Sequence, residues 1–110
     1  MKTKPLFPTL RESNRYIVFK VMPKKHSGKA IESVLQRSFE KYLGIFEMSK
    51  MGIKIMDIDD NKGIIKCNHD AQNKVVSAMT MITDIEKENA IFVTEHISGI
   101  LKKAKVHLKT

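Results

Sequence analysis

Lysine and arginine gather at the two ends of the chain, where their side chains could bind the phosphates of a polyanion. Residues 1–29 carry eight basic residues and one acid, and residues 101–110 carry four basic residues and no acid. Residues 30–100 hold eight basic residues and eleven acids. The net charge of +8 therefore belongs to the ends. The alternative is that the lysine-rich ends only keep a small domain in solution.

Other kinds of chemistry find little support in the sequence. Cys67 and His69 would share a face of a strand, but a structural zinc site usually needs four ligands, and no CxxC or HxxxH pattern lies nearby. The aspartates at 57, 59 and 60 cluster where a hairpin turn is expected, and Asp is an ordinary turn residue. No phosphate-binding or dinucleotide-binding glycine pattern is present. We therefore predict no catalytic residue, no metal site and no cofactor bound by the protein itself.

The apolar pattern predicts six elements that would position these residues. The first strand is expected at Arg15–Met22, and a helix follows, with Ser27 as its N-cap and Gly44 at its end. A hairpin is expected from 52 to 68, with its turn at Asp59–Gly63. A second helix would be capped by Asp70 and would turn an inner face of Val75, Ala78, Met79, Ile82 and Ile85 to the core, before a last strand over 90–96.

The order βαββαβ indicates an α+β fold of the ferredoxin-like, RRM-like type, in which two helices cover one face of a four-stranded antiparallel sheet. A C-terminal helix capped by Ser98 would follow, with its lysines turned away from an apolar arc of Ile100, Leu101, Ala104 and Leu108. We expect a basic arm at residues 1–14 and one domain at 15–110, since a chain of this length usually forms a single core. Apolar positions on the helices or on the open sheet face could bind another protein.

The RNA recognition motif shares this topology and stacks bases on aromatic residues of its sheet. The strand expected at 63–68 has no aromatic residue, and Tyr16 and Phe19 of the first strand would lie on opposite faces. Base stacking on the sheet is therefore not expected. No apolar run is long enough for a membrane span, and the single cysteine cannot form an internal disulfide, so we expect a cytoplasmic protein without membrane contact.

Three stretches, P-T-L-R-E-S-N-R-Y-I-V-F-K-V at 8–21, G-I-I-K-C-N at 63–68 and H-I-S-G-I-L-K-K-A at 96–104, resemble the archaeal ribonuclease P protein component 2 family. The resemblance implies a subunit of the ribonucleoprotein that removes the 5′ leader of precursor tRNA. In that particle the RNA supplies the catalysis and uses Mg²⁺. The implied partners are the ribonuclease P RNA, protein component 3 in a heterotetramer with two copies of each, the other protein subunits, and precursor tRNA as the holoenzyme substrate.

Lysine and arginine contacts to phosphates would position such an RNA without reading its sequence. Ser98 and Gly99 at a helix start could offer backbone N–H groups to a phosphate. The predicted RNA-binding residues are Arg11, Arg15, Lys24, Lys25, Lys29, Lys66, Ser98, Gly99, Lys102, Lys103 and Lys105.

Three alternatives remain open at this point. A ribosomal or other RNA-binding protein would be equally small and basic. A ferredoxin-like regulatory module that binds a small ligand would not need basic ends. A nuclease that acts without an RNA subunit would need an active site, which the residues do not reveal.

Overall fold

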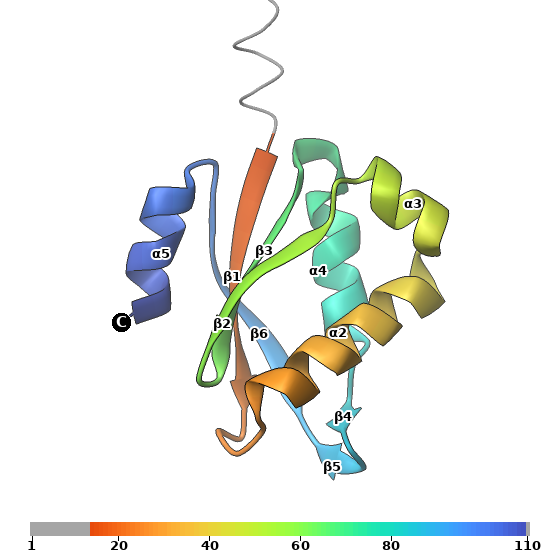
Figure 1. The fold of residues 1–110 in the computed structure, drawn as a ribbon, viewed down its shortest axis with the longest axis vertical. Coiled ribbons are helices and arrows are strands. Elements are labelled where there is room, and N and C mark those ends of the chain that lie inside the picture. The colour runs from red at the N-terminus through yellow and green to blue at the C-terminus, as the bar shows by residue number, and fades with distance from the viewer. Residues whose placement is uncertain (1–13, 110) are drawn as a thin grey trace, which may run out of the picture.

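The chain folds as one antiparallel sheet with helices on both of its faces (Figure 1). The computed structural model describes residues 14–109. Its elements are β1 (Asn14–Met22), α2 (Gly28–Tyr42), α3 (Ile45–Lys50), β2 (Lys54–Asp59), β3 (Lys62–Asn68), a 3₁₀ turn (His69–Ala71), α4 (Gln72–Thr80), β4 (Asp84–Ile85), β5 (Glu88–Asn89), β6 (Ile91–Ser98) and α5 (Leu101–Lys109).

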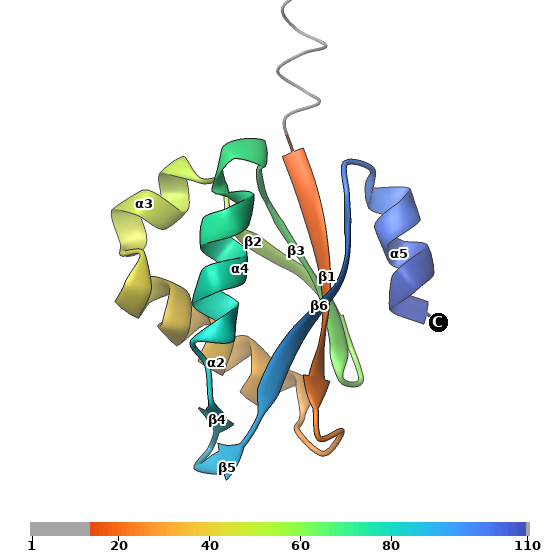
Figure 2. The ribbon, with the colours of Figure 1, turned by 180° about the vertical axis from the view of Figure 1, so that it is seen from behind.

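The four long strands lie in the order β2-β3-β1-β6, and every neighbouring pair is antiparallel. Helices α2, α3 and α4 lie on one side of this sheet and α5 lies on the other, as both views show (Figures 1 and 2). The predicted ferredoxin-like order with a C-terminal helix is confirmed. The short β4–β5 hairpin forms a separate two-stranded ribbon.

The central strand β1 is apolar on both faces because both faces are covered. Ile17 and Phe19 enter the main core under α2 and α4, whereas Val18 and part of Tyr16 contribute to a second cluster beneath α5. This alternation is the period of two that a strand imposes. Tyr16 and Phe19 therefore lie on opposite faces, as predicted.

Helix α2 has the ends that the sequence predicts. The hydroxyl of Ser27 accepts a hydrogen bond from the backbone N–H of Ala30 at 3.1 Å. Gly44 follows the helix with φ +85°, a conformation that side chains rarely adopt, and its N–H donates to the carbonyls of Phe39 and Glu40. Ile31, Leu35 and Phe39 face the core at helical spacing and are fully buried.

Helix α5 closes the second face of the sheet with a small apolar cluster. Ala104 and Leu108 are buried against Val18 and Ile64, and Leu101 packs beside them. The predicted apolar arc is thus confirmed for three of its four members. Ile100 was wrongly included, because it precedes the helix and is 52% exposed.

Other boundaries differ from the predictions. Ala71, not Asp70, directly precedes α4, and Asp70 lies in the 3₁₀ turn. Ile82 and Ile85 are buried but lie beyond the end of α4. Helix α3 and the β4–β5 ribbon were not predicted, because elements of six and two residues are too short to show a period.

Candidate nucleic-acid interface

Lys54 and Lys66 lie directly opposite each other on β2 and β3. The same row continues across the sheet to Tyr16 on β1 and Ser98 on β6. We call these four residues the upper row, because they lie at the end of the sheet where β1 begins (Figure 1). Lys54 is exposed and Lys66 is half-buried. Two cations face each other here on the sheet surface that also carries α5.

A second basic pair on the same surface is neutralised. Lys62 and Lys20 lie opposite each other on β3 and β1, and both reach Glu95, at 3.3 Å and 3.1 Å between ammonium nitrogen and carboxylate oxygen. The hydrogen bond from Lys20 lowers the pKa of Glu95 most, Lys62 lowers it further, and partial burial opposes both. Of the two lysine pairs, only the upper one has no ion pair within the described part of the chain.

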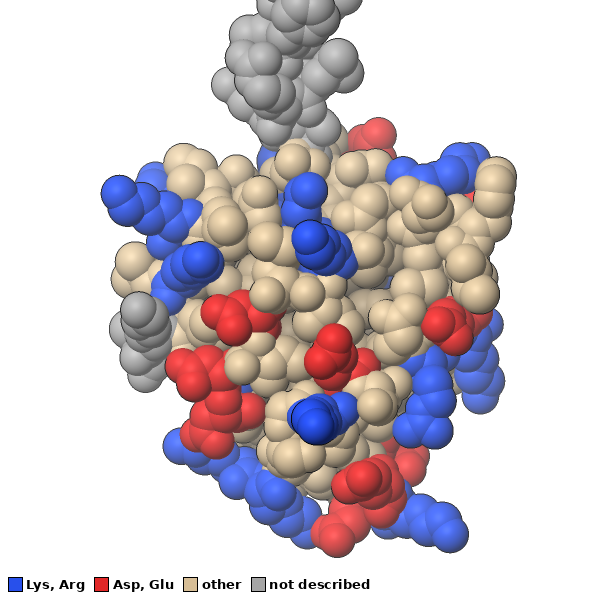
Figure 3. Space-filling view, in the orientation of Figure 1, with Lys and Arg blue, Asp and Glu red and all other residues tan. Residues whose placement is uncertain are grey.

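Helix α5 presents further lysines beside the upper row. Lys102, Lys103 and Lys105 are exposed, and residues 14–109 offer none of them an ion pair. The first turn of α5 has no acidic residue. In Figure 3 basic side chains stand over α5 and over the upper part of the sheet, whereas acidic and basic side chains mix below. This end of the molecule is therefore the one that can attract an anion.

The turn between β6 and α5 is organised by Ser98. Its buried hydroxyl accepts a hydrogen bond from the N–H of Ile100 at 3.0 Å. Because α5 begins only at Leu101, Ser98 is not its N-cap, and that expectation was wrong. Gly99 is exposed, and a Cβ at this position would lie 3.4 Å from Nη1 of Arg15. The same nitrogen donates to the backbone carbonyl of Asn14 at 2.9 Å. The fold thus brings Arg15 close to Gly99, which follows Ser98.

The structure places three predicted residues, Lys24, Lys25 and Lys29, away from this end. Lys24 pairs with Asp60 at 3.0 Å, and Lys25 pairs with Glu88. The hydrogen bond from Lys25 and its positive charge hold the pKa of Glu88 below its ordinary value. Both pairs lie at the opposite end of the sheet from the upper row (Figure 1). Two of the three lysines after β1 therefore already have carboxylate partners.

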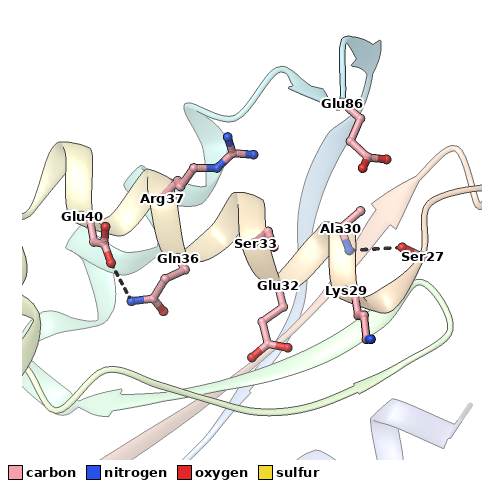
Figure 4. Close-up of a pocket in the computed structure, with 9 residues that line it drawn as sticks. All are labelled: Ser27, Lys29, Ala30, Glu32, Ser33, Gln36, Arg37, Glu40 and Glu86. Atoms are coloured by element: carbon pink, nitrogen blue, oxygen red, sulfur yellow. Dashed lines mark hydrogen bonds between the residues drawn. The ribbon is translucent and has the colours of Figure 1, made fainter.

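Lys29 lines an open hollow of about 840 Å³ along α2, together with Glu32, Arg37 and Glu40. Figure 4 shows that these side chains do not converge on one point. The hollow carries charges of both signs, so it is a poor site for a phosphate. Arg11 lies outside the described residues.

Cys67 and His69 do not share a face of one strand, because β3 ends at Asn68 and His69 lies in the 3₁₀ turn. Cys67 is buried on the core face of β3, and its burial raises the pKa of the thiol to about 11, although the charge of Arg15 opposes the shift. His69 is exposed and contacts Asp70 at 3.0 Å. Within residues 14–109, no three His, Cys, Asp or Glu side chains come close enough to hold a metal ion together. No described helix has the length and apolarity to cross a membrane.

Sequence reasoning missed Lys54. A lysine at the start of a predicted edge strand carries no signal by itself. Only the pairing of β2 with β3 places it against Lys66. A register counted from the two-residue turn Asp60–Asn61 would have placed Lys54 opposite Cys67, because the irregularity between Ile55 and Asp57 shifts the pairing by one residue.

Comparison with known proteins supports the same group of proteins that the motifs resemble. The chain is 33% identical to ribonuclease P protein component 2 of Archaeoglobus fulgidus over 105 residues, which cover 93% of this chain and 94% of the relative. It is 30% identical to ribonuclease P protein component 2 of Pyrococcus furiosus over 107 residues, covering 94% and 89%.

A chain in the cryo-EM structure of yeast ribonuclease MRP has the same fold, with a TM-score of 0.65 over 89% of this chain and 87% of that chain, at 12% identity. The model of the Rpp14/Pop5 family matches residues 15–109. This match spans the whole sheet and all the described helices. The chain therefore belongs to the Rpp14/Pop5 family of ribonuclease P protein subunits.

Proposed function

We propose that this chain is a protein subunit of ribonuclease P, the ribonucleoprotein that removes the 5′ leader of precursor tRNA, and that it binds the RNA subunit through the surface formed by α5, Lys54 and Lys66, with Arg15 at the adjoining end of the sheet beside Gly99. The RNA carries the catalysis and uses Mg²⁺, and the protein supplies position and positive charge. The cytoplasm is the compartment in which we place it.

One observation carries this proposal. The sheet neutralises Lys20 and Lys62 with Glu95, but Lys54, Lys66 and the three described lysines of α5, which are Lys102, Lys103 and Lys105, have no carboxylate partner among residues 14–109. Unpaired cations on one surface are what a phosphate backbone needs, and such contacts give affinity without base readout. The aromatic ring of the upper row, Tyr16, is half-buried in the cluster beneath α5, which fits an RNA recognised through its shape and backbone.

A second surface is suited to bind a protein partner, which we take to be component 3. Ile45 and Phe46 on α3 are 72% and 74% exposed, and Tyr42 at the end of α2 and Met81 just after α4 are also exposed. An apolar hollow of about 300 Å³ lies between Tyr42, Leu43 and Met81. Large apolar side chains that are this exposed mark protein contacts more often than RNA contacts. We propose that component 3 covers this patch in a heterotetramer with two copies of each subunit.

The two surfaces lie on opposite sides of the sheet, so the RNA and component 3 can be bound at the same time (Figure 1). The other protein subunits and precursor tRNA would then meet this assembly as parts of the holoenzyme.

The test is precursor-tRNA cleavage by an archaeal ribonuclease P RNA at limiting Mg²⁺, with component 3 present throughout and this chain added or withheld. We expect cleavage to rise only when both proteins are present. A component 2 from a relative serves as the positive control. If that control restores cleavage and this chain does not, the proposed function is wrong, and association with ribosomal subunits is the next possibility to measure.

A further inference from the structure

We propose that Lys54 and Lys66 act together as a site for one phosphodiester group of the RNA backbone, on the sheet face beside α5. This inference rests on the proposed function. It goes further by naming a two-lysine site and the chemical group that it binds, a phosphate held by cations from two neighbouring strands.

The first argument is that the repulsion between Lys54 and Lys66 lowers the stability of the free protein. Residues that lie directly opposite each other on antiparallel strands have their Cβ atoms about 5 Å apart, and two like charges at such a position destabilise the sheet. Lys54 and Lys66 occupy such a position. A phosphate between them would relieve the repulsion, because both ammonium groups can reach the same anion.

The second argument is the contrast within β3. Lys62 and Lys66 are four residues apart, with Ile64 of the cluster beneath α5 between them, so all three side chains leave the same face. At Lys62 the fold itself supplies a carboxylate, from Glu95. At Lys66 the described residues supply none. The fold thus neutralises one end of the strand and leaves the other for an external anion.

The third argument is access. β2 is an edge strand, and Lys54 on it is exposed. Lys66 lies between Lys54 on β2 and Tyr16 on β1. Tyr16 packs in the same cluster as Leu101, the first residue of α5. The site is therefore bounded by α5 on one side and open along the β2 edge on the other. An RNA strand that enters over this edge runs directly toward the first turn of α5, where Lys102 and Lys103 lie.

The experiment measures binding of an archaeal ribonuclease P RNA to this chain alone over a series of KCl concentrations. The variants are Lys54→Gln, Lys66→Gln and the double variant. The control variants are Lys41→Gln, Lys74→Gln and their double, which make the same change of charge on α2 and α4, on the other face of the sheet.

We expect Lys54→Gln and Lys66→Gln each to weaken RNA binding about tenfold. Each should also reduce the slope of log affinity against log salt concentration by about 1, as the loss of a phosphate contact does. Because the two lysines share one phosphate, the double variant should lose much less than the product of the two single losses. Losses no larger than those of the control variants would overturn the site. A double variant whose loss equals the product would show two separate contacts and would overturn the shared phosphate.

The free protein supplies a second measurement that needs no RNA. At low ionic strength Lys66→Gln should raise the midpoint of thermal unfolding, and added salt should remove the gain, because screening weakens the repulsion in the parent chain. Lys74→Gln should show no such gain. An unchanged midpoint at every salt concentration would contradict the proposal. If the parent chain does not bind the RNA at any KCl concentration, the proposed function fails together with the site, whereas RNA binding that Lys54→Gln and Lys66→Gln leave unchanged overturns the site alone.

Discussion

Lys62 and Glu95 are joined across the sheet at 3.3 Å because β6 contains a bulge. Val18 pairs with His96, and the next residue of β1, Phe19, pairs with Thr94. Glu95 therefore has no residue opposite it in the backbone pairing of β1 with β6. A bulge re-aims side chains, and here the carboxylate reaches both Lys62 and Lys20. The bulge thus divides one face of the sheet into a neutral end and a basic end.

Replacing Glu95 with Gln should extend the basic end over the whole face. Lys20 and Lys62 would lose their counter-charge, so we expect tighter RNA binding with a steeper salt dependence. The free energy of unfolding should fall by only about 0–1 kcal/mol, because the groups are partly exposed. Binding isotherms at several KCl concentrations check the first expectation. Glu86→Gln, on an exposed turn, is the control and should change neither quantity.

The stability effect of Glu95 has a definite pH dependence. The pKa of Glu95 is lowered in the folded protein, chiefly by the hydrogen bond from Lys20. Its contribution is therefore present above the ordinary pKa of a glutamate and is lost as the pH falls below about 4. The parent chain and Glu95→Gln should differ in urea unfolding at pH 7, and the difference should shrink as the pH is lowered from about 5 towards 2. A difference that stays constant over this range would contradict this assignment.

The lysines of α5 should contribute more to RNA binding than those of the loop after β1. We expect Lys102→Gln with Lys103→Gln to reduce the salt slope by about 2, since each removes about one phosphate contact. Lys24→Gln with Lys25→Gln makes the same change of charge where Asp60 and Glu88 already pair with the lysines. Filter binding compares the two double variants. Equal reductions would place the loop in the interface as well.

Docking of α5 on the sheet should depend on Leu108. Its side chain is 5% exposed and closes the cluster over Val18 and Ile64. Leu108→Ala should lower the free energy of unfolding by about 2–3 kcal/mol, the lower part of the range for buried leucines. Val106, 61% exposed on the same helix, is the control, and Val106→Ala should cost less than about 0.5 kcal/mol. Equal losses in urea unfolding would show that α5 is not held by this cluster.

Cys67 should resist alkylation in the folded protein. The thiol is fully buried, and its burial raises the pKa to about 11, so very little reactive thiolate exists at pH 8. Iodoacetamide labelling followed by mass spectrometry should be slow in buffer and fast in urea. Fast labelling of the folded chain would mean that β3 opens readily.

The sequence predicted the parts of the fold whose patterns are long or chemically marked. The helical spacing of Ile31, Leu35 and Phe39 predicted which face of α2 is buried. Ser27 and Gly44 marked the two ends of this helix. The 3₁₀ turn displaced Asp70 from the cap of α4, and a turn closed by Ser98 delayed α5 until Leu101. The first error arose because the 3₁₀ turn separates Asp70 from the start of α4, and the second because a side chain that can cap a helix can also close a turn just before one.

The candidate site was only half predictable. Charge counting identified the lysines of α5, because basic residues clustered in sequence tend to remain together on one surface. It did not single out Lys66, which lies in residues 30–100, where acids outnumber bases. It could not tell paired lysines from unpaired ones. Lys25 meets Glu88, 63 residues away, and Lys66 meets Lys54 through strand register. The folded sheet decides which lysines have a carboxylate partner. This difference distinguishes the neutral end of the sheet face from its basic end.

Gly63 tests how tightly the hairpin that holds Lys62 and Lys66 is packed on β1. Gly63 lies opposite Phe19, and a Cβ at this position would lie 2.5 Å from Cζ of the ring and 3.0 Å from the carbonyl oxygen of Asp57. Gly63→Ala should therefore cost about 1–3 kcal/mol in urea unfolding, as overpacking does.

A second substitution separates this clash from a general effect of adding a methyl group. In a Phe19→Leu background the ring is gone, so Gly63→Ala should cost clearly less there, and the double-mutant cycle should show coupling. Gly28→Ala is the control, because its Cβ would meet only Cγ2 of Ile58 at 3.4 Å, an ordinary contact. The same cost for Gly63→Ala in both backgrounds would mean that the carbonyl of Asp57, and not the Phe19 ring, requires glycine at this position.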